Sequence, residues 1–260
     1  MFRSRLKTTG ERGPEDIPKE RSGAIGTVID DYLYLFGGYS ETGNINSLYR
    51  LNFKSLTWRL MKPSGVAPLE CDKSSCWEYD GKMYIFAGYG PDSRQVSEER
   101  NFDFNVDPAS QWHYIRGWSN QFVCYDPETD SWKWPKVKGQ KPTARAAHAV
   151  VKVKNNVYLF GGRNGCARMN DMFVLNMDTL KWRQLMSYDA DFQMKGRSWH
   201  TLTKISDNEL ILYGGFSQNN VPLNDCWKYS IKDNEWIKLD LSLAEPRIWH
   251  SAILSPSGES

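Results

Sequence analysis

One short pattern occurs four times in this chain and constrains its fold more than any other feature. An apolar run rich in β-forming residues ends in Gly-Gly or Ala-Gly, as in YLYLFGGY (32–39), KMYIFAGY (82–89), NVYLFGGR (156–163) and ELILYGGF (209–216). Such runs predict β-strands, and a glycine at a strand end allows a positive φ and the close approach of another backbone. The chain is therefore built from internal repeats.

Two further features accompany each glycine pair. An apolar or aromatic residue stands seven positions before a tryptophan: Leu51/Trp58, Tyr125/Trp132, Leu175/Trp182 and Tyr229/Trp236. Upstream of the glycines, a basic residue stands three positions before a small residue, cysteine or histidine: Arg21/Ala24, Lys73/Cys76, Arg145/His148, Arg197/His200 and Arg247/His250. The distances from the second residue of each glycine pair to the tryptophan are 20, 44, 20 and 21 residues. The repeat is therefore about 50 residues long, with one insertion in the second unit.

A period of about 50 residues with these marks resembles the kelch-repeat family, from about residue 19 onward. The resemblance implies an all-β kelch β-propeller, in which a recurring tryptophan packs each four-stranded sheet on the next. We expect four complete blades and the first strand of a further one, at about 19–62, 63–136, 137–186, 187–240 and 241–260. Residues 1–18 are expected to be a lead segment or the tail of a preceding blade. The insertion is expected at about 90–118.

Composition narrows the functional classes. With 40% hydrophobic and 25% charged residues the chain has the composition of a globular domain, and its net charge of +2 argues against nucleic-acid or membrane binding as its main role. No apolar run is long enough for a transmembrane helix, and the first residues lack the apolar core of a signal peptide. Five cysteines without a CxxC pair favour reduced thiols, and therefore a cytoplasmic or nuclear protein.

The topology of a four-stranded meander predicts where function lies. The start of strand one and the end of strand two share an edge, so the loops that open each blade and those that follow each glycine pair lie on one face. Loops on a rigid frame commonly carry binding residues. This face should be cationic and rich in tryptophan, which suits an anion with an extended, weakly polar tail. Its prominent residues are Tyr39, Lys73, Tyr89, Trp118, Arg163, Arg168, Ser198, Trp199, Phe216 and Trp249.

The motifs RMNDMFVLNMDTLKW, GRSWHTL, EPRIWHSA and RGW are similar to those of the kelch domain-containing protein 2 subfamily. That subfamily comprises six-bladed substrate receptors of elongin/cullin-2 type ubiquitin ligases, which recognise C-terminal diglycine degrons. The resemblance implies that protein C-terminal peptides ending in glycine are the partners. It implies that their carboxylate is held by Arg163, Arg168, Ser198 and Lys73, between walls formed by Tyr89, Trp118, Trp199 and Trp249. Relative to the subfamily, the first blade and the C-terminal box that docks the ligase are expected to be absent here.

Other residues favour structural interpretations. The recurring His148, His200 and His250 suggest hydrogen bonding in the core, and the recurring Arg145, Arg197 and Arg247 suggest bonds between blades. The recurring tryptophans are expected to be structural.

An enzyme is not expected. A kelch-type oxidase would require a copper-binding set of tyrosine and histidine, for which His113 is the only histidine outside the repeats. No catalytic motif occurs, so no catalytic residue, metal or cofactor is expected. The remaining alternative is a general kelch scaffold for another protein partner, such as actin. It predicts no tight binding of short C-terminal peptides.

Overall fold

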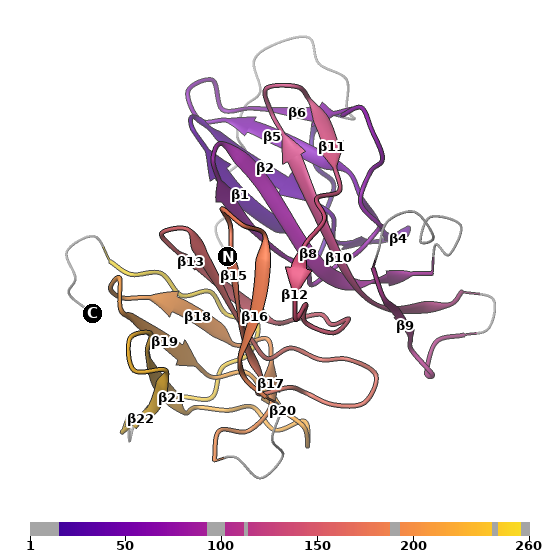
Figure 1. Cartoon of the computed structure of the whole chain (residues 1–260). Helices are drawn as coiled ribbons and strands as arrows, with labels where there is room; N and C mark the ends of the chain where they lie inside the picture. The colour runs from indigo at the N-terminus through magenta and orange to yellow at the C-terminus, as the bar shows by residue number, and fades with distance from the viewer. Residues whose placement is uncertain (1–15, 93–101, 112–113, 188–192, 241–243, 256–260) are drawn as a thin grey trace.

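The computed structural model describes residues 16–92, 102–111, 114–187, 193–240 and 244–255 (Figure 1). These residues form one main sheet in each of four blades and no α-helix. Two short ribbons accompany them, β3 (Tyr39–Ser40) with β4 (Gly43–Asn44) and β17 (Arg197–Ser198) with β20 (Phe216–Ser217), and β12 (Lys138–Gly139) adds a parallel edge strand to the third sheet. Blade 1 consists of β1 (Ile25–Ile29), β2 (Tyr32–Phe36), β5 (Leu48–Asn52) and β6 (Thr57–Met61). Blade 2 consists of β7 (Ser75–Tyr79), β8 (Lys82–Pro91), β10 (Arg116–Asp126) and β11 (Ser131–Lys133). Blade 3 consists of β13 (Ala149–Val153), β14 (Asn156–Phe160), β15 (Met172–Asn176) and β16 (Lys181–Met186). Blade 4 consists of β18 (Thr201–Lys204), β19 (Glu209–Tyr213), β21 (Cys226–Ser230) and β22 (Glu235–Leu239).

The blades are arranged about their first strands. Strands β1, β7, β13 and β18 contact one another in that order, and the sheets fan outward from them (Figure 1). Each blade pairs its four strands in sequence order with antiparallel neighbours. This arrangement confirms the predicted all-β propeller architecture with four complete four-stranded blades.

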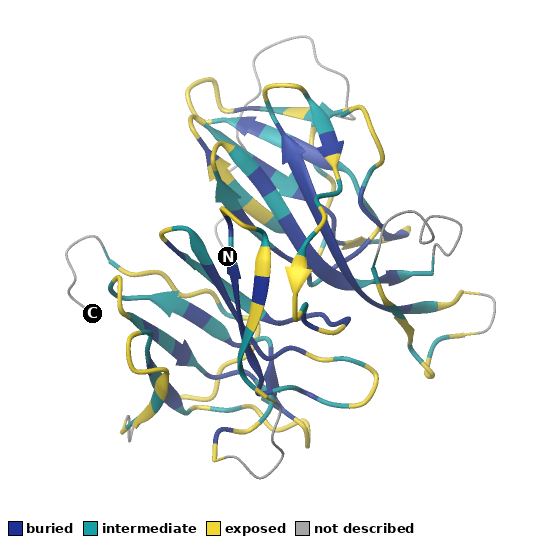
Figure 2. Ribbon diagram, in the orientation of Figure 1, coloured by how far each residue is buried: buried dark blue, intermediate teal, exposed yellow. Residues whose placement is uncertain are grey.

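Apolar side chains between neighbouring sheets form the core. Burial is concentrated in the middle strands, as Figure 2 shows for β8, β10, β14 and β15. In blades 2, 3 and 4 the recurring tryptophan packs on the aromatic residue that stands directly before the Gly-Gly or Ala-Gly pair of the preceding blade. Ring centroids are 5.6 Å apart for Trp132 and Phe36, and 5.2 Å apart for Trp182 and Phe86. The seven-residue spacing also has a physical cause, because Leu175 and Trp182 are opposite each other across the hairpin of β15 and β16.

The glycine pairs join each blade to the next one. Gly161 has a φ of 63°, and a Cβ atom there would lie 2.8 Å from the carbonyl oxygen of Arg197. The N–H of Gly162 donates to that same carbonyl at 2.9 Å. Any side chain at Gly161 would therefore disturb both the backbone conformation and the joint between blades 3 and 4.

The start of blade 2 is aligned differently from the sequence prediction, which matched Lys73 to Arg145. The N–H of Gly38 donates to the carbonyl of Cys71, as the N–H of Gly88 does to that of Arg145. Cys71 is therefore the structural counterpart of Arg145, and Lys73 lies two positions further on. The prediction was wrong because the basic residue was taken as the mark of this position, which a buried cysteine occupies in blade 2.

The predicted insertion is partly strand. Strand β8 continues to Pro91 and β10 begins at Arg116, so the ends of the 90–118 segment extend the sheet. A short additional strand, β9 (Phe104–Val106), pairs with β10. The residues between 93 and 101 and at 112–113 lie outside the described part of the chain.

The expected first strand of a fifth blade is not formed in residues 244–255. A first strand is defined by its pairing with the second strand of its own blade, and none of residues 244–255 is paired in this way. At the other end, residues 1–15 lie outside the described part, and the carboxylate of Asp16 accepts a hydrogen bond from the N–H of Leu60 on β6 at 2.9 Å.

Candidate functional site

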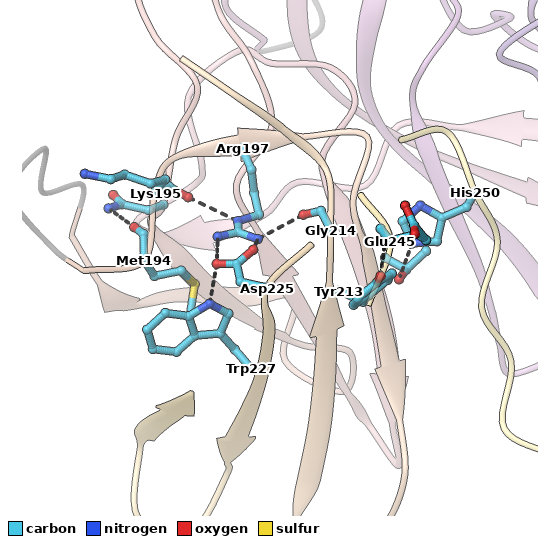
Figure 3. Close-up of polar contacts among 11 residues, drawn as sticks. Met194, Lys195, Arg197, Tyr213, Gly214, Asp225, Trp227, Glu245 and His250 are labelled. Atoms are coloured by element: carbon cyan, nitrogen blue, oxygen red, sulfur yellow. Dashed lines mark hydrogen bonds and ion pairs between the residues drawn. The ribbon is translucent and has the colours of Figure 1, made fainter. Parts of the chain in front are cut away.

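Two recurring arginines are structural, but their side chains bond within one blade and not between blades, which corrects that part of the prediction. Figure 3 shows the guanidinium of Arg197, which is fully buried and donates to both oxygens of Asp225 at 2.7 and 2.8 Å. It also donates to the carbonyl of Gly214 at 2.9 Å. Arg145 repeats this geometry with Asp171 in blade 3. These two arginines are neutralised inside the fold and are unavailable to a ligand. The third, Arg247, is exposed and forms no ion pair with a described residue.

The predicted face is present. In every blade the residue that opens the blade forms a backbone bridge with the residue that follows the glycine pair. The bridges are Ser22–Tyr39, Asp72–Tyr89, Ala146–Arg163 and Ser198–Phe216. The meander therefore brings the two sets of loops to one edge of each sheet, as its topology required.

At the centre of this face, five residues form what we call the central arc: Gly23, Lys73, Ala147, Trp199 and Trp249. Each has a φ between 55° and 64°. From Lys73 onward, each N–H donates to the carbonyl of its counterpart in the preceding blade, at 2.9, 2.8, 2.9 and 3.2 Å. Lys73 therefore stands in register with Trp199 and Trp249. Residues other than glycine are strained at such a positive φ. Backbone strain of this kind tends to occur at functional sites.

Six of the eight predicted site residues line one cavity of about 340 Å³, the rim cavity. They are Lys73, Tyr89, Trp118, Arg163, Trp199 and Trp249. Two aromatic pairs form its walls, with ring centroids 5.1 Å apart for Tyr89 and Trp118 and 5.3 Å apart for Trp199 and Trp249. The guanidinium carbon of Arg163 lies 5.9 Å from the ring of Trp118. Residues from three blades, and from the start of blade 5, thus converge here.

The other two predicted residues, Arg168 and Ser198, lie behind the cavity. Both are buried, and Arg168 Nε donates to Ser198 Oγ at 3.0 Å while its Nη1 donates to the Ser217 carbonyl at 2.9 Å. Burial and the neighbouring Arg163 lower the pKa of Arg168 below its usual value. A backbone bridge joins Arg163 to Arg168. The two guanidinium groups thus differ in environment. Arg163 is exposed, whereas Arg168 is buried and hydrogen-bonded to neutral oxygen atoms.

Neither arginine has a carboxylate partner. Within the described residues, Arg163 forms no hydrogen bond or ion pair through its side chain, and the hydrogen bonds of Arg168 go to hydroxyl and carbonyl oxygens. A cation held in a partly desolvated site without a counterion favours the binding of an anion. The pair therefore suits a small anionic group such as a carboxylate.

Two carboxylates at this site were not predicted. Asp72 is buried and forms an ion pair with Lys73, while its Oδ1 has no hydrogen-bond partner among the described residues. Asp107 accepts a hydrogen bond from the Tyr89 hydroxyl at 2.8 Å, and burial together with this bond raises the pKa of Tyr89 to about 12. Asp107 belongs to the insertion, which has no counterpart in the other repeats, so no repeat-based signal could have identified it. The Asp-Lys dipeptide at 72–73 was a signal available for Asp72.

Two of the three recurring histidines pack without hydrogen bonds to described residues, whereas His250 Nε2 lies within hydrogen-bond distance of Thr201 Oγ1, at 3.2 Å. His148 and His200 are buried, and their rings stand edge-on to Phe86 and Phe160 with centroids 5.7 and 5.6 Å apart. Neither ring nitrogen of His148 finds a partner among the described residues, which corrects the predicted hydrogen bond. Burial and the nearby Arg145 lower the pKa of His148 to about 3. At neutral pH, His148 is therefore uncharged and packs in the core as an aromatic ring.

Two findings bear on metals and membranes. Within the described ranges, no three side chains of His, Cys, Asp or Glu lie close enough together to hold a metal ion. Over the same ranges, no helix is long and apolar enough to cross a lipid bilayer.

Comparison with known proteins identifies the family. The KLHDC2/KLHL20/DRC7 Kelch-repeats domain matches residues 3–117 and 113–257. The chain belongs to the kelch-repeat family. The solved structure of YjhT shares the fold of this kelch-repeat chain, with a TM-score of 0.67 and 17% identity over 93% of this chain and 72% of the other.

Among curated relatives, Kelch domain-containing protein 2 of Bos taurus is 40% identical over 253 residues, which is 94% of this chain. Kelch domain-containing protein 1 of Mus musculus is also 40% identical, over 252 residues. This kelch-repeat chain covers 61% of the length of either relative. Family membership supports a protein-binding module, as kelch relatives are generally binding scaffolds.

Proposed function

We propose that the rim cavity binds the C-terminal carboxylate of protein partners, with glycine preferred at the terminus. The observation that carries this proposal is the pair Arg163 and Arg168, two guanidinium groups without carboxylate partners beside a cavity walled by aromatic rings. Arginine forms two-point, charge-assisted hydrogen bonds to a carboxylate. The surrounding rings exclude water and strengthen those bonds.

The four predicted carboxylate ligands have different roles in this proposal. Arg163 is exposed and makes the first contact. Arg168 then binds the same carboxylate from the buried side, and its hydrogen bond to Ser198 holds it in place. Lys73 adds a donor from the opposite wall, where it is already paired with Asp72. The aromatic walls limit the room beside the peptide terminus, which favours residues without side chains over larger ones.

The biological role follows as a second step of the proposal. The chain acts as a substrate-recognition module of an elongin/cullin-2 type ubiquitin ligase that reads C-terminal diglycine degrons, without catalysis, metal or cofactor of its own. The support is the likeness to Kelch domain-containing proteins 1 and 2, together with a cavity lined by six of the residues that the subfamily resemblance implies. All five cysteines are free thiols, which supports a cytoplasmic or nuclear location.

Fluorescence polarisation with a short labelled peptide ending in Gly-Gly tests the binding proposal. A charge-assisted bond contributes roughly 1.5–3 kcal/mol, so Arg163→Ala or Arg168→Ala should weaken binding by about ten- to a hundredfold. A C-terminal amide should weaken binding at least as much, since it removes the negative charge.

The control variant is Arg183→Ala, an exposed arginine on β16, which should bind like the unmodified chain. Equal affinity for the acid and the amide would overturn the carboxylate pocket. The protein would then remain a kelch scaffold for another protein partner.

A further inference from the structure

A second and larger cavity adjoins the rim cavity. This central cavity has a volume of about 510 Å³ and shares Lys73, Ala147, Trp199 and Trp249 with the rim cavity. On the side of blades 1 and 2 it is lined by Tyr39, Asp72 and Arg116. A ligand that fills the rim cavity can therefore continue directly into the central cavity.

Arg116 is the cationic group that distinguishes the central cavity. It is the first residue of β10 and lies in the last part of the 90–118 insertion. Its guanidinium carbon lies 4.3 Å from the ring centroid of Tyr89 and 5.0 Å from that of Tyr39. Its Nη2 donates to Asn44 Oδ1 at 2.7 Å. Two aromatic rings and one amide thus hold the guanidinium in a defined orientation.

The charge of Arg116 is not neutralised by any described residue. Its Nε is buried without a hydrogen-bond partner, and no described carboxylate forms an ion pair with it. By contrast, Arg145 and Arg197 each bind an aspartate, and Lys73 binds Asp72. A preoriented, partly desolvated guanidinium without a counterion favours an anionic ligand group.

We propose that Arg116 forms a second anion subsite, which binds the side-chain carboxylate of an aspartate or glutamate upstream of the C-terminus. This rests on the proposed function, in which Arg163 and Arg168 hold the terminal carboxylate. Arg116 stacks on Tyr89 and Arg163 on Trp118, so the two subsites flank this aromatic pair, whose centroids are 5.1 Å apart. An extended peptide advances about 3.3 Å per residue, which places the acidic residue roughly two to four positions before the last one.

The experiment compares labelled peptides that end in Gly-Gly and differ at one upstream position. Glutamate, glutamine and lysine are placed in turn at each of the three positions before the diglycine. With the unmodified chain, one position should give affinities in the order glutamate, glutamine, lysine, with about a tenfold gain of glutamate over glutamine. Arg116→Gln should abolish that gain, whereas Arg183→Gln should retain it.

The outcomes separate the two proposals. If glutamate and glutamine bind equally at every position while the acid still binds more tightly than the amide, the Arg116 subsite is wrong and the carboxylate pocket stands. If the acid and amide bind equally, the pocket itself is wrong. Should Arg116→Gln fail to fold by circular dichroism, the peptide series on the unmodified chain decides alone, and any order other than glutamate over glutamine over lysine overturns the subsite.

Discussion

At the residue scale, the glycine pairs join neighbouring blades, and the buried ion pairs hold the start of a blade to its own third strand. Gly161 and Gly81 have almost the same φ, 63° and 67°. A Cβ atom at Gly161 would meet carbonyl oxygens at 2.8 and 3.0 Å, whereas at Gly81 it would meet nothing within 4 Å. The two positions therefore separate the effect of backbone conformation from that of close packing.

Gly81→Ala should lower the free energy of unfolding by about 1 kcal/mol, the usual effect of an alanine in a left-handed conformation. Gly161→Ala should lower it by roughly 3 kcal/mol, because the joint to blade 4 must also open. Urea denaturation of both variants measures the difference. Equal losses of unfolding free energy in the two variants would show that close packing at the glycine pair does not contribute to stability.

The ion pair of Arg197 and Asp225 makes stability depend on pH. Burial disfavours the charged carboxylate, but the hydrogen bonds and charge of Arg197 outweigh it and lower the pKa of Asp225. A lowered pKa means that the ionised form stabilises the fold above the pKa of the unfolded chain. This contribution is lost as the pH falls below about 4, where the unfolded chain takes up the proton first.

Asp225→Asn should therefore lower the free energy of unfolding at pH 7 by about 3 kcal/mol, since it leaves Arg197 buried without its counterion. The difference from the unmodified chain should shrink as the pH falls below about 4 toward the lowered pKa of Asp225. Denaturation curves across this range measure it, with the exposed Asp233→Asn as the control. A difference that stays constant with pH would contradict the role assigned to the ion pair.

At the scale of elements, the insertion in blade 2 contributes to the site more than to the fold. Strands β8 and β10 pair with each other from Pro91 and Arg116 onward, independently of the loop between them. The loop carries Asp107, which holds the Tyr89 hydroxyl at the wall of the rim cavity. The entropy of closing a loop changes only slowly with its length.

Replacing residues 92–112 with a short glycine-serine turn should thus leave the melting temperature nearly unchanged and weaken binding of the Gly-Gly peptide. Asp107→Asn should give part of the same loss, because it weakens the bond that positions Tyr89. Polarisation and thermal melts of both variants test this. Unchanged affinity in the deletion would exclude the insertion from the site.

At the scale of the whole molecule, two sheet faces are not covered by another described sheet. They are the face of blade 1 turned away from blade 2 and the face of blade 4 turned away from blade 3. Apolar side chains are exposed on both end blades, including Val28 at 50% and Ile237 at 49%. Repeats gain stability mainly from contacts with neighbouring repeats, so the end blades should be the least stable.

We expect this 260-residue chain to melt at a lower temperature, and to self-associate more, than a version with two further kelch blades fused to it. Light scattering after size-exclusion chromatography and thermal scans measure both properties. A monodisperse monomer with a sharp, reversible melt at high temperature would show that the open faces are tolerated.

The amino-acid sequence by itself determined the strands, the blade count and the face that carries the loops. These depend on local chemistry repeated four times: only glycine suits positions such as Gly161, and a tryptophan seven residues after an apolar partner lies opposite it in a hairpin. Tertiary structure decided which side chains meet on that face. It set Lys73 in register with Trp199, buried Arg168 against Ser198 and brought Asp107 to Tyr89. The physical reason is that these contacts join different blades and an insertion without a repeat counterpart, so sequence spacing carries no information about them.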